Sequence, residues 1–115
     1  MWQGMNKRKF PRAGFLCKIT VYKKGQKEKI PGRTENIGPG GICANLKKAL
    51  DKFAVVDLVL FLDDGESPIE CEARVVWVVK SKDEFDTGIE FLRIEEKDSL
   101  RIERIVQECQ KKEQG

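Results

Sequence analysis

Apolar side chains alternate with other side chains along residues 69–79, and this period of two constrains the fold more than any other feature of the sequence. Successive side chains of a strand point to opposite faces, so the pattern predicts a strand with one buried face. One parity contains Ile69, Cys71, Ala73, Val75, Trp77 and Val79; the other contains Glu70, Glu72, Arg74, Val76 and Val78. On parity alone, Trp77 is expected in the core rather than stacked on a ligand.

Further apolar or alternating segments predict strands over residues 14–22, 33–37, 42–44, 55–62 and 86–92, with turn signals at residues 24–26 and 63–68. The period then changes. Ile102, Ile105, Val106 and Cys109 have the spacing of an amphipathic helix, with Asp98 or Ser99 near its start. The expected fold is mainly β: about six short strands forming a small antiparallel barrel or sandwich, with a C-terminal α-helix packed on it.

The length of 115 residues predicts one domain, and the charged fraction of 36% is that of a soluble globular protein. No apolar run approaches the roughly 20 residues needed to span a bilayer, and no secretory signal follows Met1, so we expect a cytoplasmic protein without membrane insertion. The net charge is only +3, but residues 1–33 hold a single acid, Glu28, among many lysines and arginines. This basic third favours an anionic partner.

The sequence lacks the usual equipment of an enzyme. It has no histidine, which removes the commonest general base and the Cys/His zinc sites. Its four cysteines are far apart and lie in apolar or alternating segments, where free thiols pack as small hydrophobic groups. We therefore expect no catalytic residues, no metal and no cofactor other than a bound ligand.

Two segments carry residues suited to binding a phosphate and a base. The first is Arg8-Lys9-Phe10-Pro11-Arg12, whose arginines each offer a rigid fork of donors for a phosphate or a guanine edge. The second, residues 36–41, begins with Asn36 and is rich in glycine. An amide can pair with a base edge, and glycines let the backbone approach a ligand. Taken singly, the two segments are better explained as a solvated basic tail and an ordinary tight turn.

Together, and in this order before a barrel, the two segments resemble the PilZ family. The family signature is Arg-x-x-x-Arg followed, about twenty to thirty residues later, by Asp/Asn-x-Ser-x-x-Gly; Arg8 and Arg12 match the first part, and Asn36 and Gly41 match the ends of the second. Residues 73–77, followed by Gly-Ile-Glu-Phe at 88–91, look like the late strand pair of the family. The resemblance covers residues 7–108.

The resemblance implies a six-stranded antiparallel β-barrel that binds cyclic di-GMP on its outer surface. Residues 1–13 would be a flexible basic arm and residues 14–112 the barrel domain with its helix. Arg8 and Arg12 would clamp phosphates and guanine edges, with Lys7 as a possible further phosphate contact. Asn36 would bond a guanine, and Gly41 would permit the turn and a close approach. Ligand binding would order the arm and change the surface shown to a protein partner.

One position departs from the signature, because Gly38 stands where the family has serine. A lost hydroxyl weakens binding without abolishing it while the arginines and Asn36 remain. The departure also keeps a second hypothesis open, a degenerate PilZ-like domain that acts as a protein-interaction adaptor of the pilus-assembly type without nucleotide. A third hypothesis, a barrel for single-stranded nucleic acid, ranks lower because the chain offers few exposed aromatic residues.

Overall fold

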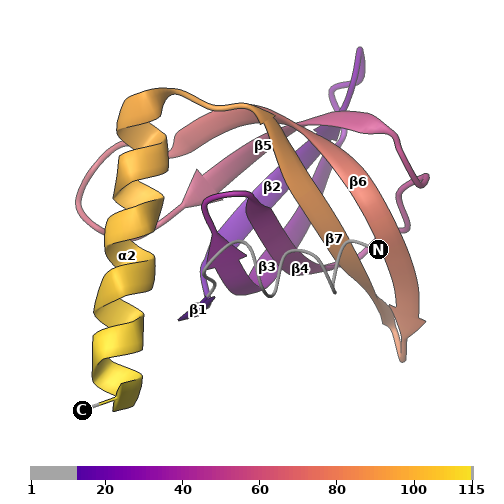
Figure 1. Cartoon of the computed structure of the whole chain (residues 1–115). Helices are drawn as coiled ribbons and strands as arrows, with labels where there is room; N and C mark the ends of the chain where they lie inside the picture. Colours follow the sequence, from indigo (N-terminus) through magenta and orange to yellow (C-terminus); the bar gives the residue numbers. More distant parts are fainter. Residues whose placement is uncertain (1–12, 115) are drawn as a thin grey trace.

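A computed structural model of the protein describes residues 13–114, and the side chains of residues 14–109. Within residues 13–114, seven strands precede one helix (Figure 1). The elements are β1 (Ala13–Gly14), β2 (Lys18–Lys23), β3 (Lys29–Gly38), β4 (Gly41–Leu46), β5 (Val55–Phe61), β6 (Ile69–Ser81), β7 (Glu84–Arg93) and α2 (Glu96–Gln114). All the predicted strands are present, and several extend further than the sequence pattern indicates.

Six of the strands close into an antiparallel barrel. Their order is β3-β2-β5-β6-β7-β4, and pairing between β3 and β4 closes the ring. β1 adds two residues on the β2 side of β3, where Ala13 lies opposite Ile37 and Gly14 opposite Asn36. The predicted barrel with a C-terminal helix is confirmed. The predicted strand over residues 14–22 is interrupted at residues 15–17, which separate β1 from β2.

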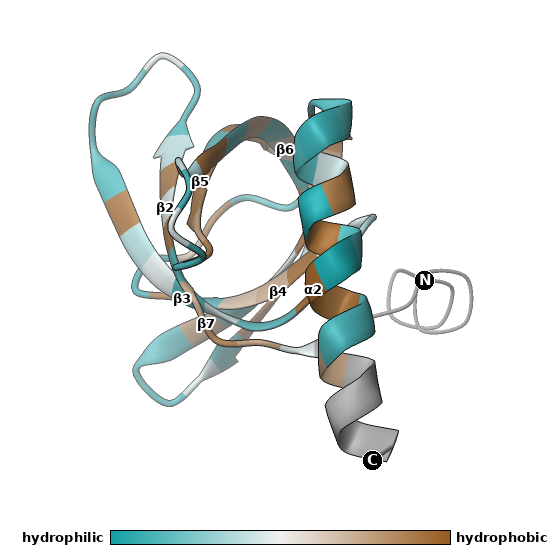
Figure 2. Cartoon of the chain, turned by 90° about the vertical axis from the view of Figure 1, so that its left-hand side faces the viewer, coloured by the Kyte–Doolittle hydropathy of each residue, from teal (hydrophilic) through white to brown (hydrophobic). Residues whose placement is uncertain are grey.

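The barrel interior is filled by aliphatic side chains from every long strand, because each strand places alternate residues inward. Fully buried examples are Ile19, Ile30, Ile37, Ile42, Leu46, Leu58, Leu60, Ile69 and Ile89. The helix α2 lies across one end of the barrel, with its apolar residues toward the strands (Figures 1 and 2). Ile102 and Val106 are buried in the same core. The predicted amphipathic helix is therefore confirmed, although it begins at Glu96 rather than at Asp98 or Ser99.

Three register shifts interrupt the pairing of the strands: one lies between Glu72 and Ala73 of β6, and the other two are the β-bulges described next. In β3, Thr34 pairs with Ala44 but Asn36 pairs with Cys43, so Glu35 is the extra residue. In β6, Val75 pairs with Ile89 but Trp77 pairs with Gly88, so Val76 is the extra residue. A bulge changes which face of the sheet the following residues occupy. Both bulges lie on strands that flank the β4–β7 pair.

Cys17, Cys43 and Cys71 are buried, and Cys109 is half-buried. Burial, with smaller effects from Asp98 and Asp57, raises the pKa of Cys71 to about 12. Within the described residues, no helix has both the length and the apolar character needed to cross a bilayer. In the same part of the chain, no cluster of Cys, Asp and Glu is arranged to hold a metal ion.

Candidate functional site

A row of four residues crosses the outer wall of the barrel on neighbouring strands. The register places Asn36 of β3 opposite Cys43 of β4, Cys43 opposite Gly88 of β7, and Gly88 opposite Trp77 of β6. Directly opposed residues in antiparallel strands point to the same face. Because Ile37, Ile42 and Ile89 point into the core, the row faces outward. We call these four residues the outer row.

Asn36 carries the clearest sign of a binding site. Its Oδ1 atom is buried, and among the described residues it accepts no hydrogen bond. A buried acceptor without a partner costs about 1–3 kcal/mol, so native proteins keep few of them. A ligand that donates to Oδ1 would satisfy this atom. The predicted binding residue Asn36 therefore lies on the outer wall with an acceptor that no described residue uses.

Trp77 lies on the outer row and not in the core, so the parity-based prediction for this residue is wrong. The bulge at Val76 moves Trp77 opposite Gly88, onto the face that Val75 does not occupy. The indole lies directly against Gly88, because a Cβ atom built on that glycine would be 2.2 Å from Nε1. The missing side chain of Gly88 is what allows the ring to lie along the wall. The side chain of Trp77 is half-buried in this position.

Thr34 fixes the path of the chain next to the outer row. Its buried hydroxyl donates to the carbonyl of Phe15 at 2.5 Å and accepts from the amide of Cys17 at 2.9 Å. The amide of Thr34 in turn donates to the carbonyl of Cys17 at 2.9 Å. These bonds hold residues 15–17 against β3, so that β1 runs beside Asn36. A buried threonine within a polar strand was not recognised in the sequence as a positioning residue.

The predicted binding residues Arg8, Arg12 and Lys7 lie outside the described residues, and so does most of the predicted arm. The structure does show where the chain enters the barrel. Arg12 is followed directly by Ala13, which pairs with Ile37, while Gly14 pairs with Asn36. The first described residues are thus immediate neighbours of the Asn36 segment. This is the arrangement that a shared site for the two sequence segments would need.

Gly38 and Gly41 face each other at the end of the β3–β4 hairpin, with Pro39 and Gly40 as the turn. Gly41 does not adopt a left-handed φ. A Cβ atom on Gly41 would lie 2.2 Å from the carbonyl oxygen of Ile89, which means that β4 and β7 approach too closely for any side chain. The glycine of the sequence motif therefore has a packing role of its own, independent of a ligand.

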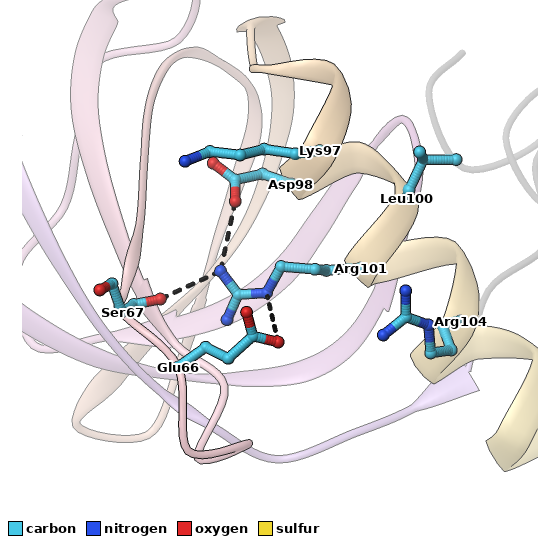
Figure 3. A pocket seen from close by; sticks show the side chains of 7 residues that line it. All are labelled: Glu66, Ser67, Lys97, Asp98, Leu100, Arg101 and Arg104. Atoms are coloured by element: carbon cyan, nitrogen blue, oxygen red, sulfur yellow. Dashed lines mark hydrogen bonds and ion pairs between the residues drawn. The ribbon is translucent and has the colours of Figure 1, made fainter.

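A second polar cluster lies between the β5–β6 loop and α2 (Figure 3). Arg101, only 11% exposed, contacts Asp64 through Nη2 at 2.9 Å and Asp98 through Nη1 at 3.2 Å. Nη1 also donates to the carbonyl of Ser67 at 3.0 Å. We call these four residues the helix clamp. Burial raises the pKa of Asp64, but hydrogen bonds from Arg101 and the Glu66 amide outweigh it, so the pKa lies below its ordinary value.

The family model for the PilZ domain matches residues 6–108. The comparison with curated proteins gave no match. Among solved structures, the motility inhibitor MotI/DgrA of Bacillus subtilis superposes with a TM-score of 0.78 at 20% identity, covering 90% of this chain. This chain spans 51% of the MotI chain, so it corresponds to about half of that protein.

Two further structures were solved with c-di-GMP. The PilZ domain of YcgR from Escherichia coli has a TM-score of 0.71 at 14% identity, covering 92% of this chain and 93% of that chain. The MrkH–c-di-GMP complex from K. pneumonia has a TM-score of 0.72 at 20% identity, covering 88% of this chain and 50% of that chain. At these identities the likeness shows the fold.

Proposed function

Because this chain belongs to the PilZ domain family, we propose that it is a receptor module for cyclic di-GMP and not an enzyme. The proposed site is the outer row together with the segment that precedes β1. The observation that carries the proposal is the buried Oδ1 of Asn36, which accepts no hydrogen bond from any described residue and lies beside the strand that continues the Arg8–Arg12 segment.

Each proposed contact follows from the chemistry of the ligand. Cyclic di-GMP has two phosphates and two guanines. Arg8 and Arg12 would bind phosphates and guanine edges through paired donors, with Lys7 as an added phosphate contact. Asn36 would accept from a guanine amino or imino group, and the indole of Trp77 would offer a face for stacking. Gly38 and Gly41 would keep the hairpin free of side chains that block the ligand.

The proposed mechanism is an ordering of residues 1–13 on the barrel wall. Arginines that bind a ligand seated on the outer row would draw this segment toward Asn36 through β1. α2 contacts both β1 and β3, so a change at β1 reaches the helix. The new surface would then be presented to a protein partner. A ligand shifts the equilibrium between the free and the ordered segment only as far as it binds the ordered state more tightly. The arginines must therefore contact the ligand directly for binding to order the segment.

Calorimetric titration of cyclic di-GMP into the full chain tests the proposal. The wild type is expected to bind, and the Arg8→Ala/Arg12→Ala variant is expected to lose at least about a hundredfold in affinity, since two charged hydrogen-bonding groups are removed. Lys27→Ala/Lys29→Ala, at the β2–β3 hairpin, removes the same charge elsewhere and should bind like the wild type. Equal heats from the wild type and the arginine variant would exclude the arginines from the site.

The adaptor function without nucleotide remains the second candidate, and Gly38 is the residue that favours it. The family serine is absent there, so one polar ligand contact is missing. The same titration separates the two functions. No heat from the wild type at high micromolar cyclic di-GMP would reject the receptor function and leave the adaptor.

A further inference from the structure

Glu35, the extra residue of the β3 bulge, places a carboxylate beside the outer row. The Sγ of Cys43 lies 3.7 Å from its Oε1. The amide of Asn45, with its NH2 group between two carboxylates, donates to the same Oε1 at 2.8 Å and to Oδ1 of Asp86 at 2.7 Å. Asn45 therefore holds the Glu35 side chain over β4, next to the residue that faces Asn36.

The second oxygen of this carboxylate has no partner among the described residues. Glu35 is exposed, and its Oε2 accepts no hydrogen bond from the part of the chain that the structure describes. In the next residue, the buried Oδ1 of Asn36 is also without a donor in that part of the chain. Consecutive residues thus offer two acceptors, one exposed to solvent and one buried, and a ligand on this wall could donate to both. This arrangement does not suit phosphate, because an anion repels a carboxylate and offers no protons.

A guanine edge supplies the missing donors. The N1–H and the exocyclic N2–H2 groups of guanine lie side by side and match a pair of acceptors, whereas adenine presents the lone pair of N1 at the corresponding place. A site whose polar groups would otherwise stay unpaired discriminates strongly against a base that lacks the donors. The carboxylate of Glu35 beside a site for a doubly negative ligand is therefore explained if it accepts hydrogen bonds from a base and not from a phosphate.

We propose that Glu35 is a specificity-determining residue that accepts hydrogen bonds from the Watson–Crick edge of one guanine of a cyclic dinucleotide, with Asn45 as its positioning residue. The proposal rests on the proposed function and deepens it, because it names the residue that selects guanine. Asn36 alone offers one carbonyl acceptor, and Glu35 adds a charged one, which forms the stronger hydrogen bond.

The test compares two ligands by calorimetry, on the wild type and on variants of Glu35, Asn45 and Glu70. Cyclic di-IMP differs from cyclic di-GMP only in lacking the N2 amino groups. In the wild type, this loss is expected to weaken binding at least about tenfold, as for a charged hydrogen bond. In Glu35→Gln, cyclic di-GMP should bind about tenfold more weakly, and the ratio between the two ligands should shrink to a few-fold. Asn45→Ala should give a smaller loss in the same direction.

Glu70→Gln is the matched control, since Glu70 is exposed on β6, opposite Val59 of β5 and away from the outer row. Glu70→Gln should leave the affinities for both ligands, and the ratio between them, unchanged. Equal melting temperatures of the wild type, Glu35→Gln and Glu70→Gln would exclude unfolding as the cause of the weaker binding. An unchanged ratio in Glu35→Gln, with normal cyclic di-GMP binding by the wild type, would overturn the role of Glu35 and leave the receptor function intact. Failure of the wild type to bind cyclic di-GMP would overturn both.

Discussion

The helix clamp and the outer row are both polar, yet they treat their hydrogen-bonding groups in opposite ways. In the clamp, the guanidinium of Arg101 bonds to two carboxylates and a carbonyl, so its donors are used within the fold. On the outer row, Asn36 keeps a buried acceptor that no described residue satisfies. Polar groups that hold the structure together complete their bonds internally, whereas groups left incomplete are available to a ligand. Substitutions in the two regions should therefore act on different properties.

Arg101→Ala should have the largest effect, and only on stability. The substitution leaves the buried carboxylate of Asp98 without its cation and releases the β5–β6 loop from α2. We expect a loss of about 2–3 kcal/mol in the free energy of unfolding, less than for a fully buried pair because Asp64 remains partly exposed. Urea denaturation measures this loss, with Arg104→Ala, an exposed neighbour on the same helix, as the control. Unchanged stability would show that the clamp is dispensable.

Asn36→Ala should weaken ligand binding without destabilising the fold. It removes no hydrogen bond made within the described residues and deletes a buried acceptor without a donor, so the free energy of unfolding should not fall and should rise by about 1 kcal/mol. Binding of cyclic di-GMP should weaken about tenfold, because one acceptor for the ligand is lost. Denaturation and calorimetry on the same sample provide both values. A large loss of stability with unchanged affinity would place Asn36 among the structural residues, and the outer row would then not differ from the helix clamp.

Acid should weaken the clamp in a defined pH range. The folded state lowers the pKa of Asp64 below its ordinary value of 3.8, so this carboxylate stabilises the protein above that pH, and the contribution is lost as the pH falls through the lower value. The difference in melting temperature between the wild type and Arg101→Ala should therefore stay constant from about pH 5 to 8 and narrow below about pH 4. A constant difference down to about pH 2 would contradict the assignment.

Gly38→Ser should have the smallest effect, a gain of a few-fold in affinity for cyclic di-GMP. The substitution restores the hydroxyl of the family signature, and a neutral hydrogen bond is worth about 0.5–1.5 kcal/mol. Calorimetry with Ser67→Gly as a remote glycine–serine control measures the gain. A loss of affinity would mean that the hairpin in this chain has no room for the hydroxyl.

The strands of the barrel could be predicted because inward and outward side chains alternate regularly along most of the chain. Residues 55–61 and 69–75 alternate as the sequence indicates, and their inward residues form the core. The closure of the barrel through β3 and β4 could not be derived from any single segment, because it depends on pairing along the whole sheet. The prediction of a closed six-stranded barrel was based instead on the resemblance to the PilZ family.

The candidate site was only partly predictable. Asn36 and the glycines were identified from the signature, but Trp77 was placed on the wrong face because simple alternation does not reveal a bulge. Glu35 had no signal at all: its role depends on Asn45 and Cys43 of the next strand, contacts that exist only once the hairpin has folded. Thr34 resembles any strand residue until residues 15–17 are seen to bond to it.

The bulges at Glu35 and Val76 let the chain be shortened at these two points without losing the pairing on either side. Deleting Glu35 would leave Thr34 opposite Ala44 and Asn36 opposite Cys43, in a regular ladder. Deleting Val76 would likewise leave Val75 opposite Ile89 and Trp77 opposite Gly88. A deletion of one codon at a bulge therefore keeps the outer row on the outer wall, whereas a deletion of a paired residue in either strand would turn the following side chains to the other face.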